Sequence, residues 1–193
     1  MSKVTNLVIV GVGGQGTLLA SRILGNFYEN RGLEVKVSEV HGMSQRGGSV
    51  VTYVRAGESV ASPLVGDGEA DVIFAFEKLE ALRSVSALKP GGTLFVNTQE
   101  ISPMPVITGA AKYPEEIVEK LEKAGAHVVS ADALRTAEEA GSVKAVNVVM
   151  LGLASRTLGG SEEEWDAALV AAVKPKLLDL NRRAFALGRN MAR

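Results

Sequence analysis

The stretch that decides the fold is Leu7-Val8-Ile9-Val10-Gly11-Val12-Gly13-Gly14-Gln15-Gly16. Its apolar run predicts a buried, parallel-type strand over Val4–Val10, and the apolar stripe after the glycines predicts a helix over Gln15–Asn30. A strand, a glycine turn and a helix start in this order are typical of a phosphate-binding loop, because the free N–H groups at a helix start attract anions. The alternative is that the glycines only make a tight strand-to-helix turn.

Each glycine of this turn has an expected role. Gly11 allows a sharp exit from the strand, and Gly13 allows the atoms of another molecule to approach the backbone closely. Gly16 allows the helix to pack against the strand. Together with Gly14 and Gln15, these residues are the candidate cofactor-binding set of the turn.

The pattern beyond the turn alternates between strands and helices. Further strands are expected over Glu34–Val40, Ser49–Arg55, Asp71–Phe76, Thr93–Asn97 and Ala126–Ser130. Helices are expected over Glu77–Leu88, Pro114–Ala124, Ala131–Ala140, Val146–Leu158, Ser161–Val173 and Lys176–Asn190, with a turn at Lys89–Gly92 and an extended connection at Ser102–Pro105. This order predicts a Rossmann-like layered α/β fold in one domain, with a mostly parallel sheet, a strand inserted after the second strand, and a helical C-terminus.

Composition excludes several classes of function. The net charge is −1, so no basic field favours a nucleic-acid partner. The 193 residues contain no cysteine, which excludes disulfides, thiolate catalysis and cysteine-held iron–sulfur clusters within this chain and fits a cytoplasmic protein. With 2 histidines a dedicated zinc site is not expected, and no apolar stretch is long enough to span a membrane.

Glu39 stands near the end of the second expected strand. An acid at that point of a dinucleotide fold binds the ribose hydroxyls, which makes Glu39 a candidate cofactor-binding residue for NAD or a flavin. The alternative is an acidic residue that merely ends a strand. The segment after Glu39 is a polar loop and a strand where a standard NAD enzyme has a helix, so the nicotinamide hypothesis stays an alternative.

The loop over His41–Gly48 is the most specific feature of the chain. It places an imidazole, a hydroxyl, an amide and a guanidinium among glycines, a set that can bind an anionic or planar group. Arg46 is the natural clamp for a carboxylate or phosphate, and His41 is a candidate acid–base group, although a structural role is the stronger interpretation for His41 alone. Ser44 and Gln45 complete the candidate set that faces a substrate or a partner, and the alternative is a structured loop that packs on another protein.

Gly66-Asp67-Gly68, with Asn97 farther on, imitates the signature that holds magnesium and thiamine diphosphate. In that signature the aspartate follows a strand and opens a helix. Here the segment leads into a strand, so we interpret Asp67 as a turn residue.

Three segments together carry a resemblance to a known family: the glycine turn, Glu39–Val50, and Ala145-Val146-Asn147-Val148-Val149-Met150-Leu151-Gly152. Over nearly its whole length the chain resembles the gamma-type subunit or domain of 2-oxoacid:ferredoxin oxidoreductases. The resemblance implies a single gamma-type domain over residues 1–193.

The resemblance also implies a division of labour. The complex oxidatively decarboxylates a 2-oxo acid such as indolepyruvate to an acyl-CoA, CO2 and reduced ferredoxin, with pyruvate and branched-chain 2-oxo acids as alternatives. Thiamine diphosphate, magnesium and the iron–sulfur clusters would lie on a larger partner subunit, coenzyme A would take the acyl group, and ferredoxin would accept the electrons. This chain would be non-catalytic alone, with no cofactor of its own assigned, and a homo-oligomer is the alternative assembly of the isolated chain. A free-standing NAD- or flavin-binding protein and a nucleotide-sensing module are the competing hypotheses.

Overall fold

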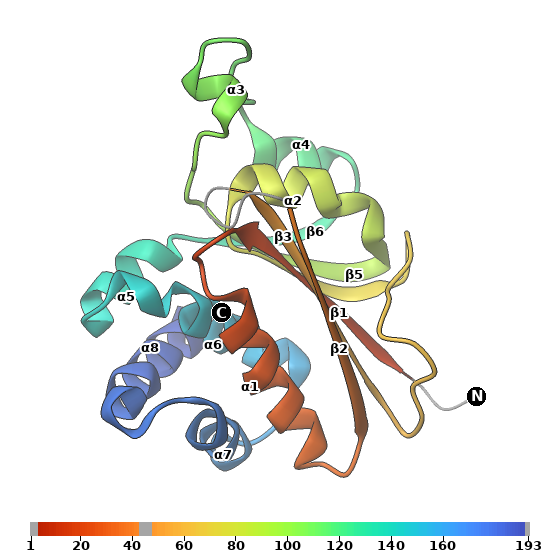
Figure 1. The fold of residues 1–193 in the computed structure, drawn as a ribbon, viewed down its shortest axis with the longest axis vertical. Helices are drawn as coiled ribbons and strands as arrows, with labels where there is room; N and C mark the ends of the chain where they lie inside the picture. The colour runs from red at the N-terminus through yellow and green to blue at the C-terminus, as the bar shows by residue number, and fades with distance from the viewer. Residues whose placement is uncertain (1–3, 43–47, 192–193) are drawn as a thin grey trace.

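A six-stranded sheet forms the centre of the molecule in the computed structural model, which describes residues 4–42 and 48–191 (Figure 1). The strands are β1 (Thr5–Val12), β2 (Glu34–His41), β3 (Ser49–Gly57), β4 (Ala70–Ala75), β5 (Leu88–Asn97) and β6 (His127–Ala131). Their order across the sheet is β2-β3-β1-β4-β5-β6. Strand β3 pairs antiparallel with both β1 and β2, while β1, β4, β5 and β6 pair in parallel. The predicted mostly parallel sheet with an inserted strand is therefore confirmed, and the inserted strand separates β2 from β1.

Helices cover both faces of this sheet. They are α1 (Thr17–Glu29), α2 (Lys78–Ser84), α3 (Met104–Ile107), α4 (Ile117–Lys123), α5 (Ala133–Ala140), α6 (Val146–Leu158), α7 (Glu162–Ala172) and α8 (Leu178–Met191). Short 3-10 turns lie at Val85–Ala87, Val143–Ala145 and Pro175–Leu177. Figure 1 shows α2 and α4 on one face of the sheet and α1 with α5–α8 on the other. Within the described residues, no helix is both long and apolar enough to cross a bilayer.

The two faces of β1 supply two separate apolar layers. Leu7 and Ile9 point into the larger layer, with α1 and α5–α8, and Val8 and Val10 point into the smaller layer, with α2 and α4. This alternation explains why the β1 sequence is apolar at every position from residue 7 to residue 10, as expected for a strand that is buried on both faces.

The α6 helix lies inside the larger layer, as its nearly continuous apolar sequence predicts. It packs directly on the backbone of α8 at two glycines. A Cβ atom at Gly152 would lie 2.2 Å from the Phe185 carbonyl oxygen, and one at Gly188 would lie 2.1 Å from the Val149 carbonyl oxygen. A side chain at either position would force the two helices apart.

Two local predictions were wrong. The helix expected over residues 77–88 ends at Ser84, and β5 begins at Leu88, so the Pro-Gly-Gly segment expected to be a turn lies inside a strand with a register irregularity. The extended connection expected over residues 102–105 instead leads into the one-turn helix α3, which has Pro105 in its first turn. Proline is compatible with that position because its fixed φ suits a helix start and its missing N–H has no intrahelical partner there.

Candidate functional site

The glycine turn joins β1 to α1 at the carboxyl end of the parallel strands. Gly16 has a φ of +82° and occupies the N-cap of α1, where a side-chain cap is absent. A Cβ atom on Gly16 would lie 2.6 Å from Asn147 Nδ2, and that amide donates a hydrogen bond of 3.0 Å to the Gly16 carbonyl oxygen. The close approach at Gly16 is therefore made by α6, and not by the strand that the sequence suggested.

Gly11 and Gly13 are also held by contacts within the chain. A Cβ atom on Gly11 would lie 2.9 Å from Gln15 Oε1 and 3.3 Å from Phe76 Cβ. The Gly13 N–H donates to the Gly48 carbonyl oxygen at 2.9 Å. This bond ties the turn to the residue just before the inserted strand, and the approach of another molecule to Gly13 stays a prediction.

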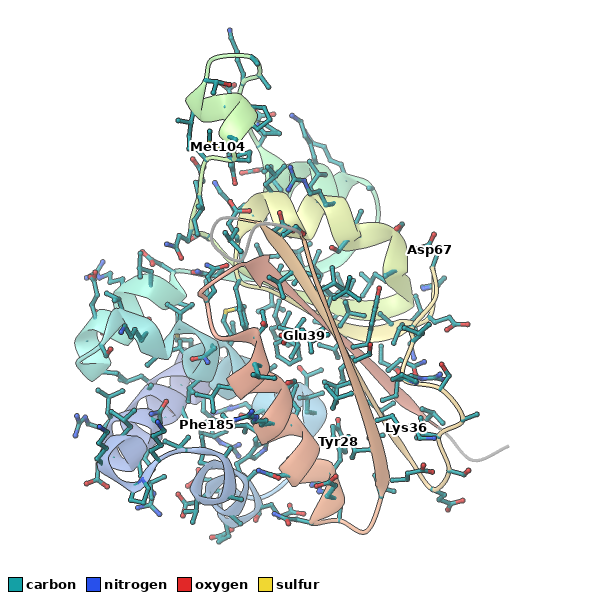
Figure 2. All side chains as sticks on the ribbon, in the orientation of Figure 1. Tyr28, Lys36, Glu39, Asp67, Met104 and Phe185 are labelled. Atoms are coloured by element: carbon teal, nitrogen blue, oxygen red, sulfur yellow. The ribbon has the colours of Figure 1, made fainter. Side chains whose placement is uncertain are left out.

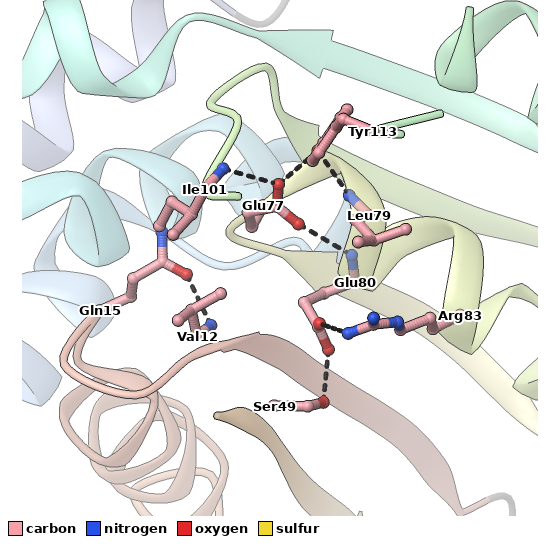
Figure 3. Close-up of polar contacts among 9 residues, drawn as sticks. All are labelled: Val12, Gln15, Ser49, Glu77, Leu79, Glu80, Arg83, Ile101 and Tyr113. Carbon is pink, nitrogen blue, oxygen red and sulfur yellow. Dashed lines mark hydrogen bonds and ion pairs between the residues drawn. The ribbon is translucent and has the colours of Figure 1, made fainter. Parts of the chain in front are cut away.

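Gln15 ties the turn to the neighbouring strand ends. Its Oε1 accepts from the Val12 N–H at 2.8 Å, and its Nε2 donates to the Phe76 carbonyl oxygen at 2.9 Å and to Gln99 Oε1 at 3.2 Å (Figure 3 shows the first of these bonds). Asn97 Nδ2 donates to the same Phe76 carbonyl oxygen at 3.0 Å. The amide of Gln15 therefore fixes the shape of the turn relative to the ends of β4 and β5.

A cavity of about 370 Å³ opens beside the turn. Its lining comes from the turn, the segment after β5, α5 and the start of α6: Gly14, Gln15, Gln99, Leu134, Glu138, Val143, Lys144 and Val146. Lys144 supplies a cation, Glu138 supplies a carboxylate on the same lining, and Gly14 and Gln15 belong to the turn that leads into the N-terminus of α1. This combination suits an anionic group on a ligand or a partner.

A second cavity, of about 530 Å³, lies between α7 and α8. Its cations already have carboxylate partners: Arg182 binds Asp166 at 2.6 and 2.7 Å, and Arg189 lies 3.5 Å from Glu162. Because these charges are internally neutralised, the smaller cavity beside the glycine turn is the better candidate for anion recognition.

The structure brings some of the predicted residues together but not others. Glu39 lies on β2, where it accepts hydrogen bonds from Thr17 Oγ1 at 3.4 Å and Thr52 Oγ1 at 3.1 Å, and it is not among the residues that line the cavity. It therefore lies close to the end of the glycine turn, although β3 separates its strand from β1.

The polar loop after β2 is only partly described. Residues 43–47, which include Ser44, Gln45 and Arg46, lie outside the described residues. The backbone of His41 pairs with Val50 at the end of β2. The two glycines that flank the undescribed part, Gly42 and Gly48, bond to Ser49 at 3.1 Å and to Gly13 at 2.9 Å, so both ends of the loop lie at the same edge of the sheet as the glycine turn.

The two residues that imitate a thiamine diphosphate signature, Asp67 and Asn97, lie apart in the structure. Asp67 precedes β4 at the amino end of the parallel strands and accepts a hydrogen bond from Ser86 Oγ at 3.1 Å, which fits a turn residue. Asn97 ends β5 at the opposite, carboxyl edge, where its Oδ1 accepts from the Ala133 N–H. The two residues cannot hold one metal ion. Within residues 4–42 and 48–191, no group of three His, Cys, Asp or Glu side chains is arranged to hold a metal.

Sequence reasoning missed two buried carboxylates near the carboxyl end of the parallel strands. They are Glu77 and Glu80, which are 1% and 2% exposed (Figure 3). Glu80 accepts from Ser49 Oγ at 2.5 Å and from Arg83 at 2.6 Å, and so it anchors the first residue of the inserted strand. Glu77 could have been recognised in the sequence because it is an acidic residue directly after an apolar strand.

Glu77 caps α2 and binds two more distant groups. Its carboxylate accepts from the Glu80 N–H at 3.0 Å, from the Ile101 N–H at 3.0 Å and from the Tyr113 hydroxyl. Desolvation raises the pKa of Tyr113, and the hydrogen bond to the Glu77 carboxylate raises it further. Tyr113 therefore stays protonated and remains a donor to Glu77 at neutral pH.

Sequence reasoning assigned no individual role to Asn147, which lies in the segment Ala145–Gly152 that carries the family resemblance. It is a buried polar residue within the apolar run of α6, and its side chain contacts the glycine turn. A lone amide in an otherwise apolar helix is the signal that marks it, because buried polar groups require a hydrogen-bonding partner.

The family model described as pyruvate ferredoxin/flavodoxin oxidoreductase matches residues 6–191. Among curated relatives, indolepyruvate oxidoreductase subunit IorB of Thermococcus kodakarensis is 47% identical over 193 residues, an alignment that covers 96% of this chain and 95% of the relative. The subunit of the same name from Pyrococcus horikoshii is 45% identical over 191 residues, with the same coverage of both chains.

A solved structure shares the fold. Pyruvate oxidoreductase subunit PORC from Thermotoga maritima superposes with a TM-score of 0.73 at 23% identity, and the superposition covers 97% of this chain and 96% of that one. At 23% identity this superposition shows a shared fold only, whereas the sequence relatives show the family.

Proposed function

Since this chain belongs to the pyruvate ferredoxin/flavodoxin oxidoreductase family, we propose that it is the accessory subunit of an indolepyruvate:ferredoxin oxidoreductase. The observation that carries the proposal is the 47% identity to an indolepyruvate oxidoreductase subunit over nearly the full length of both chains. The complex would convert an arylpyruvate to the arylacetyl-CoA and CO2 in the cytoplasm, and pass the electrons to ferredoxin.

In this proposal the redox chemistry belongs to a larger partner subunit. The chain has no cysteine to hold an iron–sulfur cluster, and Asp67 and Asn97 lie at opposite edges of the sheet, so these two residues do not form a magnesium–thiamine diphosphate site. The chain alone would therefore be inactive, and its contribution would be to complete the active site or its surroundings.

We further propose which face the chain presents to that active site. The cavity beside Gly14 and Gln15 is lined by Lys144 and lies at the turn that leads into the N-terminus of α1, and we propose that it receives an anionic group of coenzyme A or of the 2-oxo acid. The flanks of the loop that carries Ser44, Gln45 and Arg46 lie at the same edge of the sheet. We propose that this loop and the glycine turn act together on the partner-facing side, with Arg46 as the clamp for a carboxylate or phosphate.

The test begins with the tagged chain isolated from its native cells and an assay of dye reduction that requires indolepyruvate and coenzyme A. We expect a larger iron–sulfur protein to co-purify and activity to appear only when both chains are present. Pyruvate and a branched-chain 2-oxo acid at matched concentrations test the substrate class, and a preference for either would replace indolepyruvate in the proposal. A chain that elutes alone and binds NAD or a flavin would contradict it and support a free-standing Rossmann protein.

A further inference from the structure

A short arm, residues 101–111, projects from the body of the molecule between β5 and α4 and carries the one-turn helix α3 (Figure 1). Its sequence, Ile-Ser-Pro-Met-Pro-Val-Ile-Thr-Gly-Ala-Ala, contains no charged residue. Met104 and Ile107 on α3 are 65% and 66% exposed, and Figure 2 shows Met104 on this projection, away from the sheet. A charge-free projection with large exposed apolar side chains is costly in water, which points to a partner surface.

Hydrogen bonds within the arm hold its shape. The Thr108 hydroxyl donates to the Met104 carbonyl oxygen at 3.0 Å, and the Ala111 N–H donates to the Pro105 carbonyl oxygen at 2.9 Å. These bonds close the arm on itself around α3. Met104 and Ile107 are spaced as neighbours on one face of a helical turn, so the arm presents them together.

One buried carboxylate holds both ends of the arm (Figure 3). Glu77 accepts from the Ile101 N–H at 3.0 Å where the arm begins, and from the hydroxyl of Tyr113 just after the arm ends. The Leu79 N–H donates to the same hydroxyl at 3.2 Å, and Lys78 forms an ion pair with Glu100. The arm is therefore fixed to the start of α2, and little ordering entropy remains to be lost when it binds.

We propose that the arm is a preformed docking element that inserts Met104 and Ile107 into an uncharged apolar groove on the larger catalytic subunit. This inference rests on the proposed function. The larger subunit is favoured over other occupants because the arm continues directly from Gln99, which lines the cavity beside the glycine turn and hydrogen-bonds to Gln15. A partner seated on the arm would lie alongside that face, and the absence of charge on the arm gives no basis for an ionic partner.

The experiment measures the affinity between the purified chain and the larger subunit. The variant Met104→Asp/Ile107→Asp places two charges on the arm, and Val170→Asp/Leu177→Asp places two charges on exposed apolar positions outside the arm, where the side chains are 49% and 44% exposed. We expect the dissociation constant to rise by about tenfold or more for the arm variant and by less than about twofold for the control. The melting temperature of the isolated chain should change equally little for both variants, because all four side chains are exposed.

A milder variant tests the hydrogen bonds by which Glu77 holds the two ends of the arm. Tyr113→Phe removes the hydroxyl that binds Glu77 and leaves the apolar tip intact, so we expect weaker binding together with faster tryptic cleavage after Lys112. Tyr53→Phe, on β3, is the matched control and should change neither quantity.

The outcomes separate this inference from the proposed function. If the wild-type chain does not bind a larger subunit, the proposed function fails and the arm proposal fails with it. If the wild-type chain binds and the arm variant binds equally well, only the arm proposal is overturned. An arm variant that loses self-association or vesicle binding while its affinity for the larger subunit is unchanged would assign the arm to a second copy or to a lipid surface, and would also overturn the proposal.

Discussion

Gly16 shows how one residue of the turn serves both backbone shape and packing. Its φ of +82° lies in the left-handed region, and the space where a side chain would begin is filled by Asn147. For Gly16→Ala we expect a loss of about 2–4 kcal/mol in the free energy of unfolding, since backbone strain and overpacking add. Urea denaturation followed by circular dichroism measures this loss.

Gly14→Ala is the matched control for that substitution. Gly14 also has a positive φ, of +105°, but a Cβ atom there would meet nothing within 4 Å. The Gly14→Ala variant should therefore lose only the part of the free energy of unfolding that comes from backbone strain, about 1–2 kcal/mol. Equal losses for the two variants would show that the contact with Asn147 does not constrain Gly16.

The same residues show what sequence reasoning can reach at this scale. The turn itself was predictable because glycine clusters after an apolar run have few other uses. The neighbours of the turn were not, since Asn147 and Gln99 are far from Gln15 in the sequence and only the assembled sheet brings them together. The role of Gly16 was misassigned for the same reason, because the space beside it is filled by Asn147, a distant part of its own chain.

At the scale of elements, α1 is joined to α7 by Arg31 and Glu164. The guanidinium of Arg31 donates to both carboxylate oxygens of Glu164, at 2.8 and 3.0 Å, and lies 4.2 Å from the centre of the Phe27 ring. Glu164 also accepts from the Ser161 N–H, which completes the capping box of α7. The hydrogen bond from Arg31 is the main reason that the pKa of Glu164 is lowered to about 2.

This lowered pKa predicts a dependence of stability on acid. Because the folded-state pKa lies below the unfolded value of 4.5, the contribution of Glu164 is present above pH 4.5 and is lost as the pH falls toward 2. We expect Glu164→Gln to be less stable than the wild type at pH 7 and to lose less stability between pH 4.5 and pH 2. Thermal unfolding across that range measures both effects.

Glu58→Gln, at an exposed position after β3, is the control substitution for this experiment. Its unfolding should follow the wild type at every pH. A Glu164→Gln variant that keeps the full wild-type acid sensitivity would show that the bridge between α1 and α7 does not contribute to it.

Elements were predictable where their own sequence determines them. Ser161 followed by three glutamates predicted the start of α7, and the capping box confirms it. The start of β5 was missed because proline and glycine normally interrupt a strand, whereas here Leu88 already pairs with Ala70 before the irregularity. The α3 turn was missed because Pro103 and Pro105, separated by one residue, favour extended backbone unless one of them falls in a first helical turn.

At the scale of the whole molecule, the larger apolar layer connects the N-terminal and C-terminal halves. The ring of Trp165 on α7 stacks on Phe27 of α1 with 3.8 Å between ring centres, and α8 packs on α6 through Gly152 and Gly188. The other face of β1 supports the smaller layer. Neither layer can lose β1 without exposing the other, so we propose that the chain unfolds as one cooperative unit.

The single tryptophan makes this last proposal measurable. Trp165 is fully buried in the helical layer and reports on that layer alone, whereas far-ultraviolet circular dichroism reports on the whole chain. We expect tryptophan fluorescence and circular dichroism to give the same midpoint and the same slope in urea. An earlier fluorescence transition would mean that α6–α8 detach from a sheet that survives alone, and the single domain expected from the sequence would then be two folding units.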